Sequence, residues 1–136
     1  MLNSFQHLKY NMHTEIICIG SELLIGYINT NGAYISEKLS TIGLKVKREI
    51  IVGDDFEELE NVFSESFNRS DIIITTGGLG PTFDDITREA VSKATGKKLV
   101  LNKNVLKTIS EFFEKKKFKM PKDNEKQAYI LEGAEI

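Results

Sequence analysis

The sequence is poor in cysteine, has no long apolar run and has no marked excess of charge. Its single cysteine, Cys18, excludes an internal disulfide and a metal site built from several cysteines. No apolar stretch reaches the length of a membrane-spanning helix, and residues 1–12 lack the apolar core of a secretion signal. The net charge of -2 gives no electrostatic reason to expect a nucleic acid or an anionic membrane as partner. We therefore expect a cytoplasmic protein that binds neither.

The composition suits a single globular domain. The 136 residues are 40% hydrophobic and 28% charged, which allows a buried core. Residues 1–13 show no clear period, and we interpret them as a loose N-terminal extension of a domain over 14–136. The sequence ends on the apolar Ile136 and not in a polar terminal segment, so we expect this domain to be truncated at its C-terminus.

Short apolar runs alternate with helical patterns along the chain. The expected strands cover 15–19, 44–52, 71–76 and 97–101, each followed by a helix, and 129–136 looks extended after a helical turn over 124–128. This alternation predicts an α/β fold with a mostly parallel sheet and helices on both faces. The alternating run 44–52 fits a strand near the sheet edge, and the three isoleucines of 72–74 predict a central strand. Residues 20–26 are expected to form a loop.

A glycine loop follows the isoleucine-rich strand. Gly77, Gly78 and Gly80 permit positive φ and remove the Cβ atoms that would keep a ligand away from backbone N–H groups. After Pro81 we expect a helix that Gly96 ends, and a helix N-terminus over such a loop attracts phosphate. The spacing fits neither the P-loop nor the dinucleotide pattern. The loop therefore predicts a phosphate site of another kind.

Carboxylates lie in and near this loop. Asp84 and Asp85 beside a phosphate would fit a bound cation or a polarised water, but Thr82 and Asp85 also stand at capping-box spacing, which local sequence favours. Asp55 is expected to cap the helix that follows 44–52, which leaves Asp54 free at a strand end where α/β sheets bind ligands. An acidic turn residue without chemistry is the alternative for Asp54.

The segment Thr75–Thr87 resembles the motif of the molybdopterin-binding fold. Together with three further stretches, it is similar to the amino-terminal domain of the competence/damage-inducible protein CinA family. Those stretches are Gly20–Leu24 with Asn29–Asn31, then Val52–Asp55, and Asn124–Ala128 with Glu132–Ala134. The resemblance implies a three-layer αβα domain of the MoaB/Mog-like type that forms homo-oligomers.

The same resemblance implies an activity and a set of site residues. CinA-type domains hydrolyse the pyrophosphate of ADP-ribose with a divalent metal (Mg²⁺, Co²⁺ or Mn²⁺) and potassium, whereas related proteins bind or adenylylate molybdopterin. The expected ligand is therefore a small phosphorylated compound, ADP-ribose or a pterin nucleotide. Matching positions make Asp54 and Asp85 catalytic residues and metal ligands, with Asp84 as a third ligand. The matching binding positions are Glu22, Asn31, Thr76, Gly77, Gly78, Gly80, Asn124 and Gln127.

Three hypotheses remain open from the sequence. The first is metal-assisted hydrolysis of a dinucleotide pyrophosphate, and the second is binding or adenylylation of a pterin. Leu79 stands where pterin-adenylylating relatives usually carry threonine, which argues mildly against the second. The third is a nucleotide-binding or assembly module without turnover.

Overall fold

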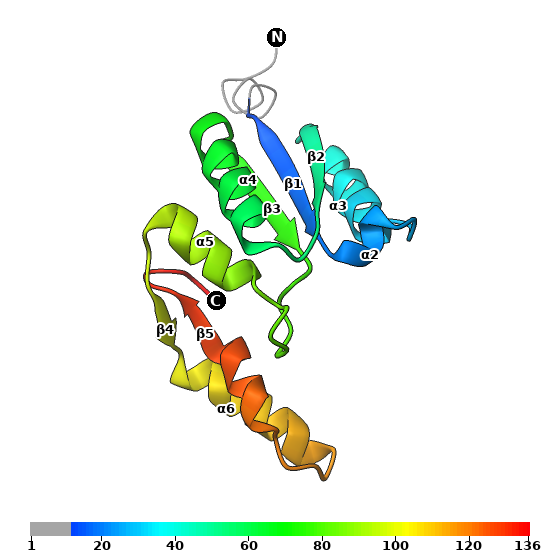
Figure 1. Ribbon diagram of the computed structural model, residues 1–136. Helices are drawn as coiled ribbons and strands as arrows, with labels where there is room; N and C mark the ends of the chain where they lie inside the picture. The colour runs from blue at the N-terminus through cyan, green and yellow to red at the C-terminus, as the bar shows by residue number, and fades with distance from the viewer. Residues whose placement is uncertain (1–11) are drawn as a thin grey trace.

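The computed structural model describes residues 12–136 (Figure 1). The elements in chain order are β1 (Thr14–Ile19), α2 (Ser21–Leu24), α3 (Thr30–Thr41), β2 (Val46–Val52), α4 (Phe56–Arg69), β3 (Ile72–Thr76), α5 (Thr87–Thr95), β4 (Leu99–Leu101), α6 (Lys103–Lys115), η1 (Lys122–Ala128) and β5 (Tyr129–Leu131). Most of the predicted N-terminal extension, residues 1–11, lies outside the described residues. No helix in the described part of the chain is long and apolar enough to cross a membrane.

Three parallel strands form the main sheet in the order β2-β1-β3. All six side chains of β1 are buried, whereas those of β3 are half-buried. The predicted edge position of β2 is confirmed. The predicted central position of β3 is wrong, because β1 pairs with both neighbours and β3 pairs only with β1 among residues 12–136. A run of β-branched residues predicts a strand with two covered faces, but it does not say how many strands pair with it.

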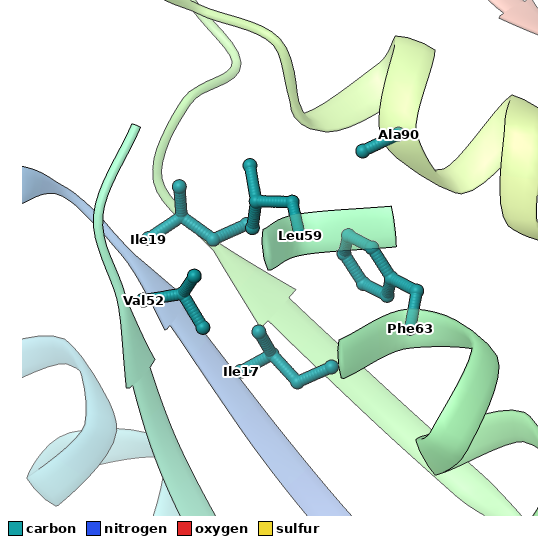
Figure 2. Packing of buried hydrophobic residues seen from close by; sticks show 6 residues of the cluster. All are labelled: Ile17, Ile19, Val52, Leu59, Phe63 and Ala90. Carbon is teal, nitrogen blue, oxygen red and sulfur yellow. The ribbon is translucent and has the colours of Figure 1, made fainter. Parts of the chain in front are cut away.

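Helices cover both faces of this sheet, as Figure 1 shows for α3 on one side and α4 with α5 on the other. Ile17 and Ile19 of β1 lie on the same face because side chains alternate along a strand. They pack with Val52 and with residues of α4 and α5, namely Leu59, Phe63 and Ala90 (Figure 2). The α/β fold with three layers and a mostly parallel sheet is thus confirmed.

Local signals set several helix ends. The Asp55 side chain accepts the N–H of Glu58 at 2.9 Å and caps α4, as predicted. Asn29 caps α3 by accepting the N–H of Gly32 at 3.0 Å, and Gly96 ends α5 with a φ of 69°. The predicted loop over 20–26 instead contains the single-turn helix α2, whose four residues are too few to give a helical period.

The last third of the chain forms a smaller unit beside α5 (Figure 1). The sequence predicts the strand β4 but not its partner, which is β5 in an antiparallel two-stranded sheet rather than the main sheet. The helices α6 and η1 connect these two strands. The expected helical turn near 124–128 is confirmed as the 3-10 helix η1.

A buried charge lies at the amino end of the main sheet. The Glu15 carboxylate accepts hydrogen bonds from Nε and Nη2 of Arg69 at 2.7 and 3.0 Å and from Oγ of Ser66 at 2.9 Å. Arg48 and His13 each approach Glu15 to 3.6 Å. The hydrogen bonds from Arg69 are the largest cause that lowers the pKa of Glu15 to about 2.

Candidate functional site

Three loops meet at the carboxyl ends of the parallel strands. They follow β1 at Gly20, β2 at Gly53 and β3 at Gly77, and the N–H of Gly20 bonds to the carbonyl of Val52 at 2.9 Å. In open α/β sheets this edge is where ligands bind. The sequence places most of its candidate residues here, as the chain order of the fold requires.

The three glycines of the loop after β3 are needed for contacts within the protein. Gly77 has a φ of 94°, and a Cβ there would collide with the carbonyl oxygen of Ile19. A Cβ on Gly78, whose φ is 60°, would collide with Oγ1 of Thr87, and one on Gly80 would collide with the Asp85 carboxylate. The absence of side chains therefore lets the loop pack tightly against the end of β1 and the start of α5.

The loop carbonyls face the start of α5. Thr87 donates its hydroxyl to the carbonyl of Gly77 at 2.9 Å and its N–H to the carbonyl of Gly78 at 3.2 Å. The predicted open helix N-terminus is thus partly occupied by the loop itself. In a trans peptide the carbonyl and the following N–H point in opposite directions. The N–H groups of Gly78 and Leu79 consequently point away from α5, which makes them the donors that this loop can offer to an anion.

Two further side chains bind the carbonyls of the glycine loop. Arg88 donates to the carbonyls of Leu79 and Gly80, the second at 3.5 Å, and burial lowers the pKa of Arg88. Gln127 donates to the Leu79 carbonyl at 3.4 Å and accepts the side-chain N–H of Asn124 at 2.8 Å. The candidate pair in η1 therefore supports the glycine loop.

Sequence reasoning did not identify Arg88. A signal was present, because a cation in the first turn of a helix opposes the helix dipole. The hydrogen bonds from Arg88 to the loop carbonyls explain why a cation occupies this otherwise unfavourable position.

Thr82, Asp84 and Asp85 form a compact group of oxygens. The hydroxyl oxygen of Thr82 lies 2.5 Å from a carboxylate oxygen of Asp84 and 2.5 Å from Oδ2 of Asp85, which also accepts the Thr82 N–H at 2.9 Å. The Thr82 hydroxyl bond is the largest cause that lowers the pKa of Asp85. One hydroxyl has one proton to donate, so it cannot satisfy both carboxylates.

This arrangement corrects the helix-capping interpretation. The helix does not begin after Pro81 but at Thr87, and its N-cap is Ile86, which makes no side-chain bond. Thr82 and Asp85 pair with each other in the preceding turn instead. Side chains of this type offer the backbone an alternative to the helix.

Lys126 joins η1 to the same turn. Its Nζ donates to the carbonyls of Thr82 and Asp85 at 2.9 and 2.5 Å and lies 3.5 Å from Oε1 of Glu89. Lys126 lies inside a stretch that resembles the CinA family, but its sequence context alone predicts no role for it. The structure shows that it fixes the backbone that carries the two aspartates.

A small pocket of about 210 Å³ lies beside the glycine loop and gathers the other candidates. Glu22, Asn31, Thr76 and Gly77 all line it, and Asn31 donates to the Thr76 hydroxyl at 3.2 Å. Cys18 also lines the pocket, and burial raises the pKa of its thiol. A neutral thiol is a poor nucleophile, so Cys18 contributes packing rather than covalent chemistry.

Asp54 stands apart from the other two aspartates. Its carboxylate accepts the N–H of Ser21 at 3.0 Å, and its own N–H donates to the Ser21 hydroxyl at 3.0 Å. The hydrogen bonds of Asp54 thus join it to the start of α2, whereas those of Asp85 join it to the Thr82 turn.

The donor set fits a hard divalent cation only in part. Oxygen ligands from Thr82, Asp84 and Asp85 are the type that Mg²⁺ or Mn²⁺ prefers. Within residues 12–136, however, no three acidic, histidine or cysteine side chains stand close enough to hold a metal ion by themselves. A cation at Asp84 and Asp85 would therefore take its remaining ligands from water or from the phosphate of a substrate.

Comparison with known proteins finds the same fold and motifs. The family model described as "Probable molybdopterin binding domain" matches residues 15–134. The chain is 51% identical over 123 residues to the "Putative competence-damage inducible protein" of Natranaerobius thermophilus, covering 90% of this chain and 30% of that protein. The chain thus spans about a third of the length of the curated relatives it matches.

Solved structures agree with this assignment. The structure of CinA from Thermoplasma acidophilum, a protein of unknown function by its title, superposes with a TM-score of 0.80 at 32% identity, over 91% of this chain and 73% of that one. The tungsten cofactor synthesizing protein MoaB from Pyrococcus furiosus gives a TM-score of 0.55 at 26% identity, over 77% and 61%.

Proposed function

The chain belongs to the probable molybdopterin-binding domain family, as a CinA-like member, and we propose that it binds a nucleotide diphosphate ester such as ADP-ribose and hydrolyses its pyrophosphate bond with a divalent cation. The carrying observation is that the loop whose Gly78 and Leu79 N–H groups point away from α5 continues through Gly80, which lies against the Asp85 carboxylate, into the turn that holds Asp84 and Asp85. An anion and its counter-ion need both features side by side.

The residues divide the work between binding and positioning. Gly78 and Leu79 would donate their N–H groups to phosphate oxygens, and Arg88 keeps the loop carbonyls turned away from that position. Thr82 orients the Asp85 carboxylate and lowers its pKa, which stabilises the ionised form. The bound cation would be held by Asp84 and Asp85, where it would supply charge neutralisation on the phosphate.

Asp54 has a different part in this proposal. The Asp54 carboxylate already accepts the N–H of Ser21, outside the Thr82 turn that holds Asp85. We therefore assign the direct contact with the cation to Asp85 and a water-mediated one to Asp54. Asp54 also holds the start of α2 through Ser21.

Binding of a molybdopterin-type ligand is the second candidate. The family description names molybdopterin, and the MoaB protein of Pyrococcus furiosus is titled as synthesising the tungsten cofactor. Both ligands would present a phosphate to the same loop. The two candidate functions are distinguished by measuring which compound binds and whether it is cleaved.

The test measures ADP-ribose cleavage by product analysis with added Mg²⁺, Mn²⁺ or Co²⁺, with and without potassium. We expect turnover with at least one of these ions, its loss with a chelator, and its recovery when the ion returns. Asp85→Asn should lower kcat by about a hundredfold, the scale on which one preorganised electrostatic group acts. Asp54→Asn should have a smaller effect, because its contact runs through water.

The control is Glu57→Gln, an exposed acid in the first turn of α4. It should leave turnover unchanged. Cleavage that is undiminished in both Asp54→Asn and Asp85→Asn would discard these assignments. Tight binding of molybdopterin without cleavage of ADP-ribose would favour the second candidate, and binding of ADP-ribose without turnover would identify a module that only binds.

A further inference from the structure

Phe83 is a large apolar side chain in an unusual place. It lies at the tip of the turn between Thr82 and Asp84, and 93% of it is exposed. Leaving a phenylalanine in water rather than burying it forgoes hydrophobic stabilisation. Covering Phe83 would therefore be favourable for whatever ligand or partner reaches it.

The turn that carries Phe83 is held in one conformation. Lys126 binds the carbonyls on either side of it, at Thr82 and Asp85, and the Asp85 carboxylate binds the Thr82 N–H. A fixed backbone reduces the conformational freedom that is lost when the turn contacts a ligand. The backbone that carries Phe83 is thus ordered before contact.

Phe83 lines a groove of about 1100 Å³ between this turn and the β4–β5 unit. Pro81, Leu99 and Tyr129 supply further apolar surface along the groove. Ligand sites are typically concave, mostly apolar and of about this size or smaller. The groove can therefore accept a ring-sized group beside Phe83.

The charges of the groove argue against a phosphate there. Four carboxylates and three cationic side chains line it, so it carries no positive excess. The phosphate donors lie instead at Gly78, and Phe83 is five residues further on, at most about 18 Å along the chain. A ligand with its phosphates on the loop can reach the groove with its neutral end.

From these observations we propose that the groove is the subsite for a planar heterocycle of the ligand, with Phe83 stacking on its face. This inference rests on the proposed function for the phosphate end of the site. Adenine and pterin share the required chemistry, a flat ring linked to phosphate. Stacking of a base on an aromatic side chain tightens binding by about tenfold or more.

The test compares three diphosphates by calorimetry on the purified chain: ADP, 6-hydroxymethylpterin diphosphate, and methyl diphosphate, which has no ring. The Phe83→Ala variant should bind at least one of the two ring-bearing compounds about tenfold more weakly, the lower range for loss of a stacking aromatic. Its affinity for methyl diphosphate should stay within about twofold of the original, because its loop donors are unchanged. Phe83→Trp should retain ring binding.

The matched control is Phe118→Ala, which removes another exposed phenylalanine, 67% accessible, beyond the end of α6. It should change none of the three affinities. The ring compound that loses affinity in Phe83→Ala identifies whether the source of the heterocycle is a nucleotide or a pterin.

Failure of this subsite and failure of the proposed function give different results. If methyl diphosphate binds as tightly as both ring compounds, the subsite is refuted and the phosphate site stands. If none of the three binds, both proposals fall. An unchanged affinity of Phe83→Ala for both ring compounds would overturn the subsite. A change of oligomeric state of that variant on sedimentation would then show that Phe83 contacts a second copy of the chain.

Discussion

Replacing Glu15 by glutamine should destabilise the fold in a way that depends on pH. Glu15 is fully buried at the start of the central strand, and its carboxylate is compensated by Arg69 and Ser66. Glutamine keeps the shape but removes the charge. Arg69 then keeps its contacts with the exposed Glu65, at 3.2 Å, and with the Ser66 hydroxyl, at 3.3 Å, but it loses its buried ionised partner.

The size of the effect follows from the pKa of Glu15, which falls from 4.5 to about 2 on folding. A shift of about 2.5 units corresponds to about 3.4 kcal/mol of stabilisation at pH 7. Because the folded pKa is the lower one, this contribution is complete above pH 4.5 and decreases as pH falls toward 2. At pH 3 about 1.4 kcal/mol should remain.

The assay is urea unfolding of the original chain and of Glu15→Gln at pH 7 and at pH 3. The difference in unfolding free energy should be about 3 kcal/mol at pH 7 and less than half of that at pH 3. The control, Glu65→Gln, removes a carboxylate that is 72% exposed and should cost less than about 0.5 kcal/mol at either pH. An equal difference at the two pH values would refute a low pKa for Glu15.

Three further substitutions test the loops around the site. Gly77→Ala should cost more than about 2 kcal/mol in urea unfolding, since it combines a positive φ with a collision against Ile19. Asn29→Ala should cost about 1 kcal/mol by removing the cap of α3, whereas Asn29→Ser should recover most of it. Thr82→Ala should raise the pKa of Asp85, measured by NMR titration of its carboxyl carbon, and an unchanged titration would contradict the role given to that hydroxyl.

Local patterns predicted the helices and strands of this fold better than they predicted which strands pair with one another. The cap at Asp55 and the stop at Gly96 depend on residues within one turn, and the structure contains both. The choice between β1 and β3 as central strand depends on which segments pair across long sequence distances. Both runs are apolar and β-branched, so their composition could not decide it.

In the site, too, some residues could be located from local sequence and others only from the fold. The glycine loop and its aspartates could be located from sequence, because their residue types and spacing are unusual. Lys126 could not, since a cation on a helix is ordinarily solvated, and Arg88 had only the indirect signal of a cation at a helix N-terminus. Only the fold shows that these two bind backbone carbonyls of the loop and the following turn. The prediction that Asp54 acts together with Asp84 and Asp85 came from positions matched to the family. Local sequence cannot give the distance between these side chains, because it depends on the three-dimensional arrangement of the strands and loops.

The contacts of the glycines also decide which substitutions can test the phosphate site. Gly77, Gly78 and Gly80 each lie against the chain's own atoms, so a side chain at any of them disturbs packing before it reaches a ligand. Loss of activity in a glycine variant would thus not separate binding from folding. Substitutions at Asp85 and Phe83 do separate them, because their side chains make no contact in the apolar core. If the phosphate site and the ring subsite are separate, Asp85→Asn should lower turnover while the chain still binds ring compounds. Phe83→Ala should weaken the binding of ring compounds while the affinity for methyl diphosphate stays the same.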